Sequence, residues 1–218
     1  MSTAAMSVYG WKDIPWRRLE RHVFKLQKRI YQAKRRRKLG TVRKLQRLLV
    51  KSQSAKLLAV RRVTQDNRGK RTAGVDGVKA LGPIQRLKLA RTLSLPAKAS
   101  PTRRVWIPKP GTQDQRPLGI PTMRDRAAQA LLKLALEPEW EAVFEPNSYG
   151  FRPGRSAHDA IGAIFAGIRF VPKYVLDADI AKCFDYASWY SVPLRRWSCA
   201  ASLRARNHAS VAGSSGKR

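Results

Sequence analysis

The chain has 218 residues, with 45 Lys and Arg against 14 Asp and Glu, and so a formal net charge of +31. Most basic side chains cannot be neutralised within the chain, and a phosphate backbone is the commonest external polyanion. A basic surface kept for solubility and a membrane-surface protein are the alternatives, but no apolar run is long enough to span a bilayer. Hydrophobic residues make up 43%, enough for one or two small cores, which excludes a wholly disordered basic tail.

The cysteines and the N-terminus indicate a reducing compartment. Cys183 and Cys199 form no CxxC pair and have no histidine ligand nearby, so a disulfide or zinc framework is not indicated. The first residues lack the charged start and apolar segment of a secretory signal. We therefore expect a cytoplasmic protein.

Two strongly basic helices are predicted at the N-terminal end. Apolar residues recur at helical spacing over residues 13–39, and Gly40 is expected to end this helix. Thr41 is expected to cap the second helix. Residues 1–62 hold 19 Lys or Arg and 2 acids, a net of +17, so more than half of the excess charge lies here.

Five consecutive basic residues lie in the last turns of the first predicted helix. Such a run is usually a solvated helix face. This one has no acid four residues away on its own helix, so its charges repel one another unless an anion binds. Together with two residues of the second helix, these are the predicted phosphate contacts: Lys34, Arg35, Arg36, Arg37, Lys38, Arg43 and Lys44.

The middle of the chain predicts a mixture of loop, helix and hairpin. A hairpin is indicated because two short strand-like runs flank the polar segment PKPGTQDQ. In chain order, the predicted elements are a loop at 64–77, a helix at 78–93 interrupted by Gly82-Pro83, strands at 103–107 and 116–120, and a helix at 124–144.

The last predicted elements are a helix and a strand. Ser156 and Asp159 form a capping-box pattern at the helix start, and Tyr174 to Ile180 is typical of a strand. Alternation places Asp177 and Asp179 on one face, roughly 7 Å apart at about 3.3 Å per residue. Such carboxylates suit a divalent cation, although solvated carboxylates at a strand end are the commoner meaning of this pattern.

The order of these segments, with the phrases IPKPG, RPLGIP, SYGFRPGRS and YVLDADIAKCFD, closely resembles the reverse transcriptases, or maturases, encoded by group II introns. The resemblance runs from about Trp11 to Asp185. It implies an α+β fold in which basic helices precede an incomplete right-hand polymerase, with residues 101–170 as fingers and upper palm. The expected domains are a flexible start at 1–10, an RNA-binding helical domain at 11–77, a partial reverse transcriptase domain at 78–185, and a disordered tail outside the family at 186–218.

The resemblance also implies roles for particular residues. Asp179 corresponds to the first metal-binding aspartate, and the backbone carbonyl of Ile180 to a neighbouring ligand, with Mg²⁺ as the cofactor. Phe184 corresponds to the bulky residue that packs on the incoming sugar and disfavours a 2′-hydroxyl. Lys109 and Arg116 correspond to the residues that clamp the incoming triphosphate.

The charges at the predicted hairpin agree with this role, because an ammonium and a guanidinium suit a triphosphate. From the residues alone, pairing of Arg116 with Asp114 or Asp125 is an equal alternative. Arg152 and Arg155 flank a Pro-Gly turn before a helix N-terminus, which suits template or primer phosphate.

The resemblance stops after Asp185. No Asp or Glu follows it, and the Tyr-x-Asp-Asp phrase that carries the family's later aspartates is missing. We therefore expect a truncated or frameshifted chain that binds structured RNA, has DNA as a further possible nucleic-acid partner, does not bind membranes and cannot polymerise alone. Two functions stay open: an RNA-directed DNA polymerase completed by a missing segment or partner, and a non-enzymatic RNA-binding module. A ribosome-associated protein is disfavoured by IPKPG and SYGFRPGRS. The sequence indicates no oligomeric state.

Overall fold

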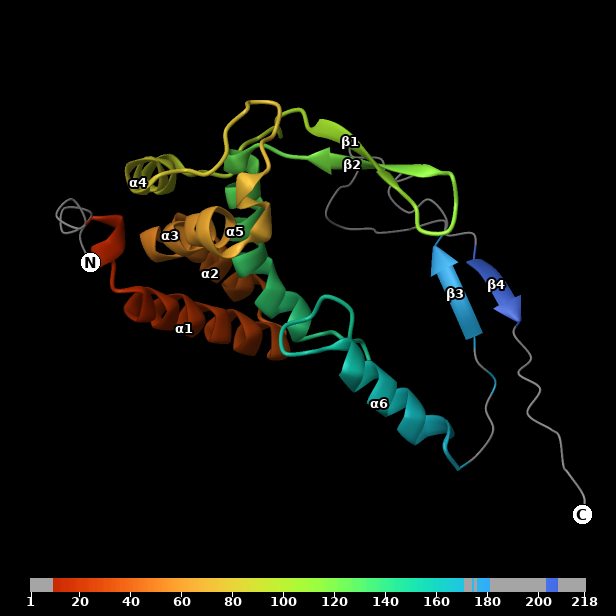
Figure 1. Cartoon of the computed structure of the whole chain (residues 1–218). Coiled ribbons are helices and arrows are strands. Elements are labelled where there is room, and N and C mark those ends of the chain that lie inside the picture. The colour runs from red at the N-terminus through yellow and green to blue at the C-terminus, as the bar shows by residue number, and fades with distance from the viewer. Residues whose placement is uncertain (1–9, 171–173, 175, 181–202, 208–218) are drawn as a thin grey trace, which may run out of the picture. The chain divides into compact units, whose positions relative to one another are not determined.

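The computed structural model describes residues 10–170, 174, 176–180 and 203–207 (Figure 1). The chain divides into two units, Met1–Pro146 and Asn147–Arg218. The first contains η2 (Trp11–Asp13), α1 (Trp16–Arg35), α2 (Leu39–Lys51), α3 (Gln53–Arg61), η3 (Arg62–Asp66), η4 (Arg68–Arg71), α4 (Pro83–Thr92), β1 (Arg103–Pro108), β2 (Gln115–Ile120) and α5 (Met123–Glu141). The second contains α6 (Ala157–Ile168), β3 (Leu176–Ile180) and β4 (Leu203–Asn207). This content confirms the predicted α+β class. No helix in the described ranges is both long and apolar enough to cross a membrane.

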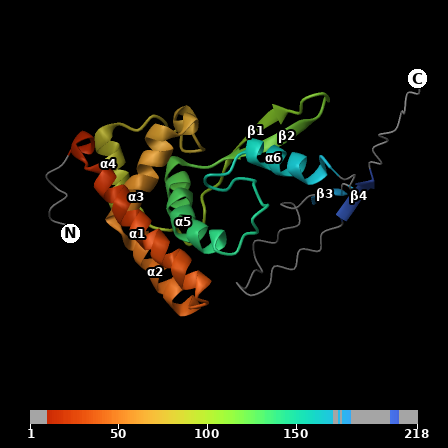
Figure 2. The same ribbon diagram turned by 90° about the horizontal axis from the view of Figure 1, so that it is seen from below.

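The core of the first unit forms where α1, α2 and α3 pack on α5. Helix α1 buries one stripe at helical spacing, with Val23 and Ile30 almost fully enclosed. Helix α5 contributes Leu131 and small residues that allow close approach, among them Ala127 and Ala135. Figure 2 shows α1 and α2 side by side along α5. Because these helices bury their apolar stripes, their charged residues are directed outward.

The junction of the two basic helices differs from the sequence prediction. Helix α1 ends at Arg35, and α2 begins at Leu39. Gly40 therefore lies in the first turn of α2, and Thr41 lies inside that helix. The predictions that Gly40 ends the first helix and that Thr41 caps the second are both wrong.

The observed end of α1 is a C-terminal turn built on an arginine. The Lys38 N–H donates to the carbonyl of Ala33 at 2.9 Å, and the Arg37 N–H donates to the carbonyl of Lys34 at 2.8 Å. These two bonds satisfy carbonyls that the helix leaves free. The turn requires a residue with left-handed backbone angles, and Arg37 adopts this conformation with φ of 56°. Glycine usually fills this position, so no local pattern predicts this turn at an arginine.

The loop predicted at 64–77 begins with helical turns, since η3 and η4 occupy its first half. The following helix starts at Pro83 rather than at residue 78. Gly82 precedes it as the N-cap, and its N–H donates to Gln85 Oε1 at 2.9 Å. Pro83 suits the first helical position because it has no N–H to satisfy there. The Gly-Pro pair thus starts the helix instead of interrupting it.

The predicted hairpin is confirmed. Strands β1 and β2 pair antiparallel, with Arg103 opposite Ile120 and Ile107 opposite Arg116. Helix α5 follows directly, capped by the Thr122 hydroxyl, which accepts from the Asp125 N–H at 3.2 Å. It ends at Glu141, before the predicted residue 144.

In the second unit the predicted capping box is confirmed. The Ser156 hydroxyl accepts from the Asp159 N–H at 3.3 Å, and Asp159 Oδ2 accepts from the Ser156 N–H at 2.7 Å. The hydrogen bonds from the Ser156 side chain and backbone hold the pKa of Asp159 below its ordinary value. The apolar residues of α6 are exposed, including Ile164 and Phe165.

The predicted strand at Tyr174–Ile180 is observed as β3, Leu176–Ile180. It pairs antiparallel with β4, which lies in the segment predicted as a disordered tail. The other residues of 186–218 lie outside the described part of the chain.

Glu139 on α5 accepts hydrogen bonds from both α1 and α2. Lys34 Nζ donates to Glu139 Oε1 at 2.8 Å, and Gln46 Nε2 donates to Glu139 Oε2 at 2.7 Å. Burial alone would raise the pKa of Glu139, but these hydrogen bonds and the charges of Lys34 and Arg43 outweigh burial. The pKa is held below its ordinary value of 4.5.

The variant Glu139→Gln should lower the free energy of unfolding at pH 7 by about 1–2 kcal/mol, because Lys34 loses its charged acceptor. A carboxyl with a lowered native pKa stabilises the fold above its unfolded-state pKa, and this contribution is lost as pH falls through the native pKa. In urea unfolding, the difference between wild type and variant should therefore be full at pH 7 and shrink below pH 4.5.

The matched control is Glu137→Gln, which removes a pair within the same helix, four residues from Lys133, whose side chain is 60% exposed. Its effect should stay below about 0.5 kcal/mol. A difference in unfolding free energy between wild type and Glu139→Gln that stays constant from pH 7 into the acidic range would contradict the lowered pKa of Glu139.

Candidate nucleic-acid interface

Basic side chains cover the outer faces of α1 and α2. Six of the seven phosphate contacts predicted at this end are exposed: Arg35, Arg36, Arg37, Lys38, Arg43 and Lys44. Lys34 differs, because Glu139 holds its ammonium and its side chain is only 21% exposed. The prediction that this run has no acid within reach holds along its own helix. In the folded chain, α5 supplies an acid to Lys34 from outside that helix, which the helical spacing does not address.

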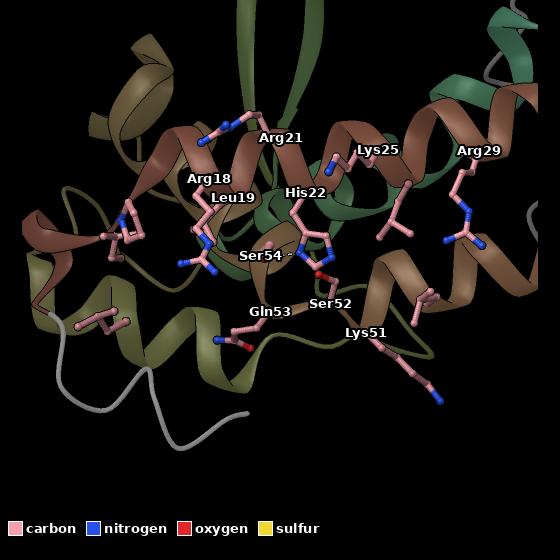
Figure 3. Close-up of a pocket in the computed structure, with 15 residues that line it drawn as sticks. Arg18, Leu19, Arg21, His22, Lys25, Arg29, Lys51, Ser52, Gln53 and Ser54 are labelled. Carbon is pink, nitrogen blue, oxygen red and sulfur yellow. Dashed lines mark hydrogen bonds between the residues drawn. The ribbon is translucent and has the colours of Figure 1, made fainter. Parts of the chain in front are cut away.

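A groove of about 930 Å³ lies beside this basic surface, between α1, the junction of α2 with α3, and α4 (Figure 3). Its floor is apolar and comes from all of these elements: Ile14, Leu19, Leu26, Leu48 and Leu87. Leu48 is 52% exposed, whereas Leu19 and Leu26 belong to the core. The groove therefore presents apolar surface to solvent next to α1.

The rim of the groove is cationic. Five Lys or Arg residues contribute to it: Arg18, Arg21, Lys25, Arg29 and Lys51. No residue assigned to its lining in the described chain is acidic. Figure 3 shows Arg18 and His22 directed from α1 toward the α2–α3 junction, with Lys51 on the opposite side. An anion at this rim would meet positive charge from two sides.

A helix break shapes one wall of the groove. Ser52 has extended backbone angles, φ −66° and ψ 128°, and separates α2 from α3. No side chain caps the start of α3, and no acid lies in its first turn. His22 Nδ1 lies 3.2 Å from the hydroxyl of Ser54, at hydrogen-bond distance. The groove thus offers an imidazole and a hydroxyl between its apolar floor and its cationic rim.

Sequence reasoning did not identify these groove cations. A signal for the α1 residues exists, because Arg18, Arg21, Lys25 and Arg29 recur at spacings of three and four residues and so share one helix face. The other wall, with Lys51, joins them only through the packing of α1 against α2 and α3. No local pattern in the sequence predicts that approach.

Of the two hairpin residues predicted to clamp a triphosphate, Lys109 is paired with an acid and Arg116 is not paired with one in the described structure. Lys109 Nζ lies 3.5 Å from the carboxylate of Asp114 across the turn, and both side chains are exposed. Asp125 accepts from the Thr122 hydroxyl at 2.8 Å. Neither acid pairs with Arg116 in the described structure, so the alternative in which Arg116 is neutralised by one of them is wrong. The triphosphate role itself stays a prediction.

The GFRPGR turn holds its two arginines in different ways. The Arg152 guanidinium donates to the carbonyl of Ser148 at 2.7 Å. The Arg155 guanidinium lies 5.5 Å from the centre of the Tyr149 ring, which is cation–π distance. Arg155 is exposed and Arg152 is partly buried. Template or primer phosphate contact by these residues stays a prediction.

The magnesium site that the resemblance implies falls on residues whose side chains the structure does not describe. Register places Asp177 opposite Arg206 and Asp179 opposite Arg204. No group of three His, Cys, Asp or Glu in the described part of the chain is arranged to hold a metal. Metal binding at Asp179 and Ile180 stays a prediction, and Phe184 lies outside the described residues.

Two family models match the chain. Residues 11–93 match the N-terminal domain of reverse transcriptase, which spans α1 to α4 and the groove. Residues 107–199 match reverse transcriptase, the RNA-dependent DNA polymerase. The second match continues to residue 199, past Asp185, at which the sequence analysis places the end of the resemblance. The fold and these matches define a protein of the reverse transcriptase class.

Several curated proteins are similar to the chain. Protein YkfC of Escherichia coli is 37% identical over 153 residues, which cover 65% of this chain and 40% of that protein. The group II intron-encoded protein LtrA of Lactococcus lactis is 43% identical over 88 residues, 39% of this chain and 14% of that protein. Maturase-like protein 1 of Euglena gracilis is 33% identical over 153 residues, 65% of this chain and 31% of that protein. The chain spans less than half the length of these relatives.

The two family matches and the named relatives together indicate one family within the reverse transcriptase class. The chain belongs to the group II intron reverse transcriptase and maturase family.

Proposed function

We propose that the chain binds structured RNA through the basic face of α1 and α2 and the adjoining groove. The family implies a nucleic-acid partner in general. RNA is the specific partner proposed, intron RNA or an RNA template, with DNA as a secondary one. The proposed compartment is the cytoplasm.

The observation that carries this proposal is the segregation of charge in the first unit. The apolar stripes of α1 and α2 are buried, while their Lys and Arg residues lie on the opposite faces. Within the described chain, tertiary ion pairs on α1 involve Lys34 with Glu139 and Glu20 with Arg61. The remaining cations of α1 stay available to an external polyanion. Phosphate binding would release condensed counterions from the RNA, which is a strong driving force at physiological salt.

The salt dependence of RNA binding tests this proposal. For a structured RNA hairpin, log affinity should fall steeply with log salt concentration. The fourfold variant Arg35→Gln, Arg36→Gln, Arg43→Gln, Lys44→Gln should reduce the magnitude of that slope by about 3, since each phosphate contact contributes roughly 0.7–0.9. Fluorescence anisotropy at a series of salt concentrations measures the slope.

The matched control removes the same charge elsewhere on the first unit, at four exposed residues: Lys79, Lys98, Arg103 and Arg124. This control should leave the slope within about 1 of wild type. Equal loss of slope in both fourfold variants would show that binding follows net charge and not the proposed face.

For polymerisation, we propose that this 218-residue chain is inactive by itself. A two-metal phosphoryl transfer needs several oxygen ligands. The sequence has no Asp or Glu after Asp185, and the later Tyr-x-Asp-Asp phrase of the family is missing from it. If the polypeptide is completed, the proposed catalytic parts are those that the family resemblance indicates: Asp179 and the Ile180 carbonyl for Mg²⁺, with Lys109, Arg116 and Phe184 at the incoming nucleotide.

A primer-extension assay on an RNA template with Mg²⁺ tests the inactivity. The chain should give no extension above a protein-free reaction, and Asp179→Ala should give the same result. Magnesium-dependent extension that disappears in Asp179→Ala would show that the chain polymerises by itself and would overturn this part of the proposal.

A further inference from the structure

The groove on the first unit combines two properties that a phosphate-binding surface does not need together. Cations alone suffice to bind an RNA backbone. This groove also has an apolar floor, in which Leu48 on α2 is 52% exposed. An exposed leucine at the base of a cationic groove indicates an occupant with an apolar part as well as an anionic part.

We propose that the groove binds one unstacked nucleotide of a structured RNA, with its base on the leucine floor and its flanking phosphates at the cationic rim. This inference rests on the proposed RNA-binding function and specifies the RNA feature that is recognised. It requires RNA with a bulge or loop, because bases inside a duplex are stacked and out of reach.

The dimensions and the rim agree with this occupant. The groove volume of about 930 Å³ is ample for a nucleotide, since sites for small organic ligands occupy roughly 300–1,000 Å³. Cations line it from two elements, α1 and the end of α2, so phosphates on either side of the base meet positive charge. No acidic residue is assigned to its lining in the described chain, and none there would repel the backbone.

The polar groups within the groove suit a base. Proteins hold unstacked bases between apolar side chains, imidazole rings and the planes of guanidinium groups. Arg18 and His22 are directed into this space in Figure 3. The His22 and Ser54 side chains lie 3.2 Å apart and offer a donor and an acceptor to the edge of a base. The groove thus has apolar, planar and hydrogen-bonding parts arranged around one site.

The experiment compares three RNA hairpins: one fully paired, one with a single unpaired nucleotide in the stem, and one with an abasic residue at that position. The wild-type chain should bind the bulged hairpin about 10-fold more tightly than the paired one, because burying the apolar face of one base against leucine side chains contributes on this scale. The abasic hairpin should lose most of the preference, since it keeps the phosphates and lacks the base.

Two protein variants test whether the groove is responsible for the preference for bulged over paired RNA. Leu48→Gln replaces the exposed leucine of the floor without changing charge, and should bring the affinities for bulged and paired RNA within about 2-fold. Leu39→Gln is the matched control, because Leu39 lies on the same helix, is 50% exposed and is not among the groove residues. It should keep the full preference. The fluorescence of 2-aminopurine at the bulge should change on binding to the control and much less on binding to Leu48→Gln.

The outcomes separate this inference from the function on which it rests. Absence of binding to all three hairpins would contradict RNA binding itself. Equal affinities for bulged and paired RNA would overturn the nucleotide site and leave RNA binding standing. A preference that survives Leu48→Gln unchanged would also overturn the inference, because the unpaired base would then be recognised elsewhere.

Discussion

The first unit depends on one constraint: its basic side chains cannot enter an apolar core without large desolvation costs. Helix α1 resolves this by burying a single stripe, in which Ile30 is fully enclosed, and by directing almost all of its cations outward. The same packing that stabilises α1 on α5 therefore produces a dense positive surface. Lys34 is the exception, and it is held by a carboxylate on α5. Fold and binding surface are two results of one amphipathic pattern.

Local patterns predicted much of this fold. The capping box at Ser156 and the β1–β2 hairpin are specified by residues close together in sequence, and both are confirmed. The end of α1 could not be predicted because Arg37 takes a backbone conformation usually left to glycine. The groove was missed for a different reason: Lys51 and the cations of α1 meet only after tertiary packing. The partner of Lys34 lies 105 residues away, which no helical spacing rule can reveal.

The two parts of the family signature differ in what the structure shows. The N-terminal reverse transcriptase match covers α1 to α4, which share one core with α5 of the polymerase match and line a formed groove. The polymerase match includes α6, whose apolar residues are exposed, and β3, which is paired with β4. Binding can therefore be argued from the geometry of the first unit. Catalysis would need carboxylates beyond those that the described residues bring together.

The most direct test of the account is lysine footprinting with an amine-reactive acetylating reagent and mass spectrometry, with and without a saturating structured RNA. RNA should protect Lys25 and Lys51 at the groove, together with Lys44 on the face of α2. Lys79 and Lys98, which are exposed outside these helices, should keep their reactivity. Unchanged reactivity of Lys25, Lys44 and Lys51 while RNA is bound would contradict the claim that this face binds RNA.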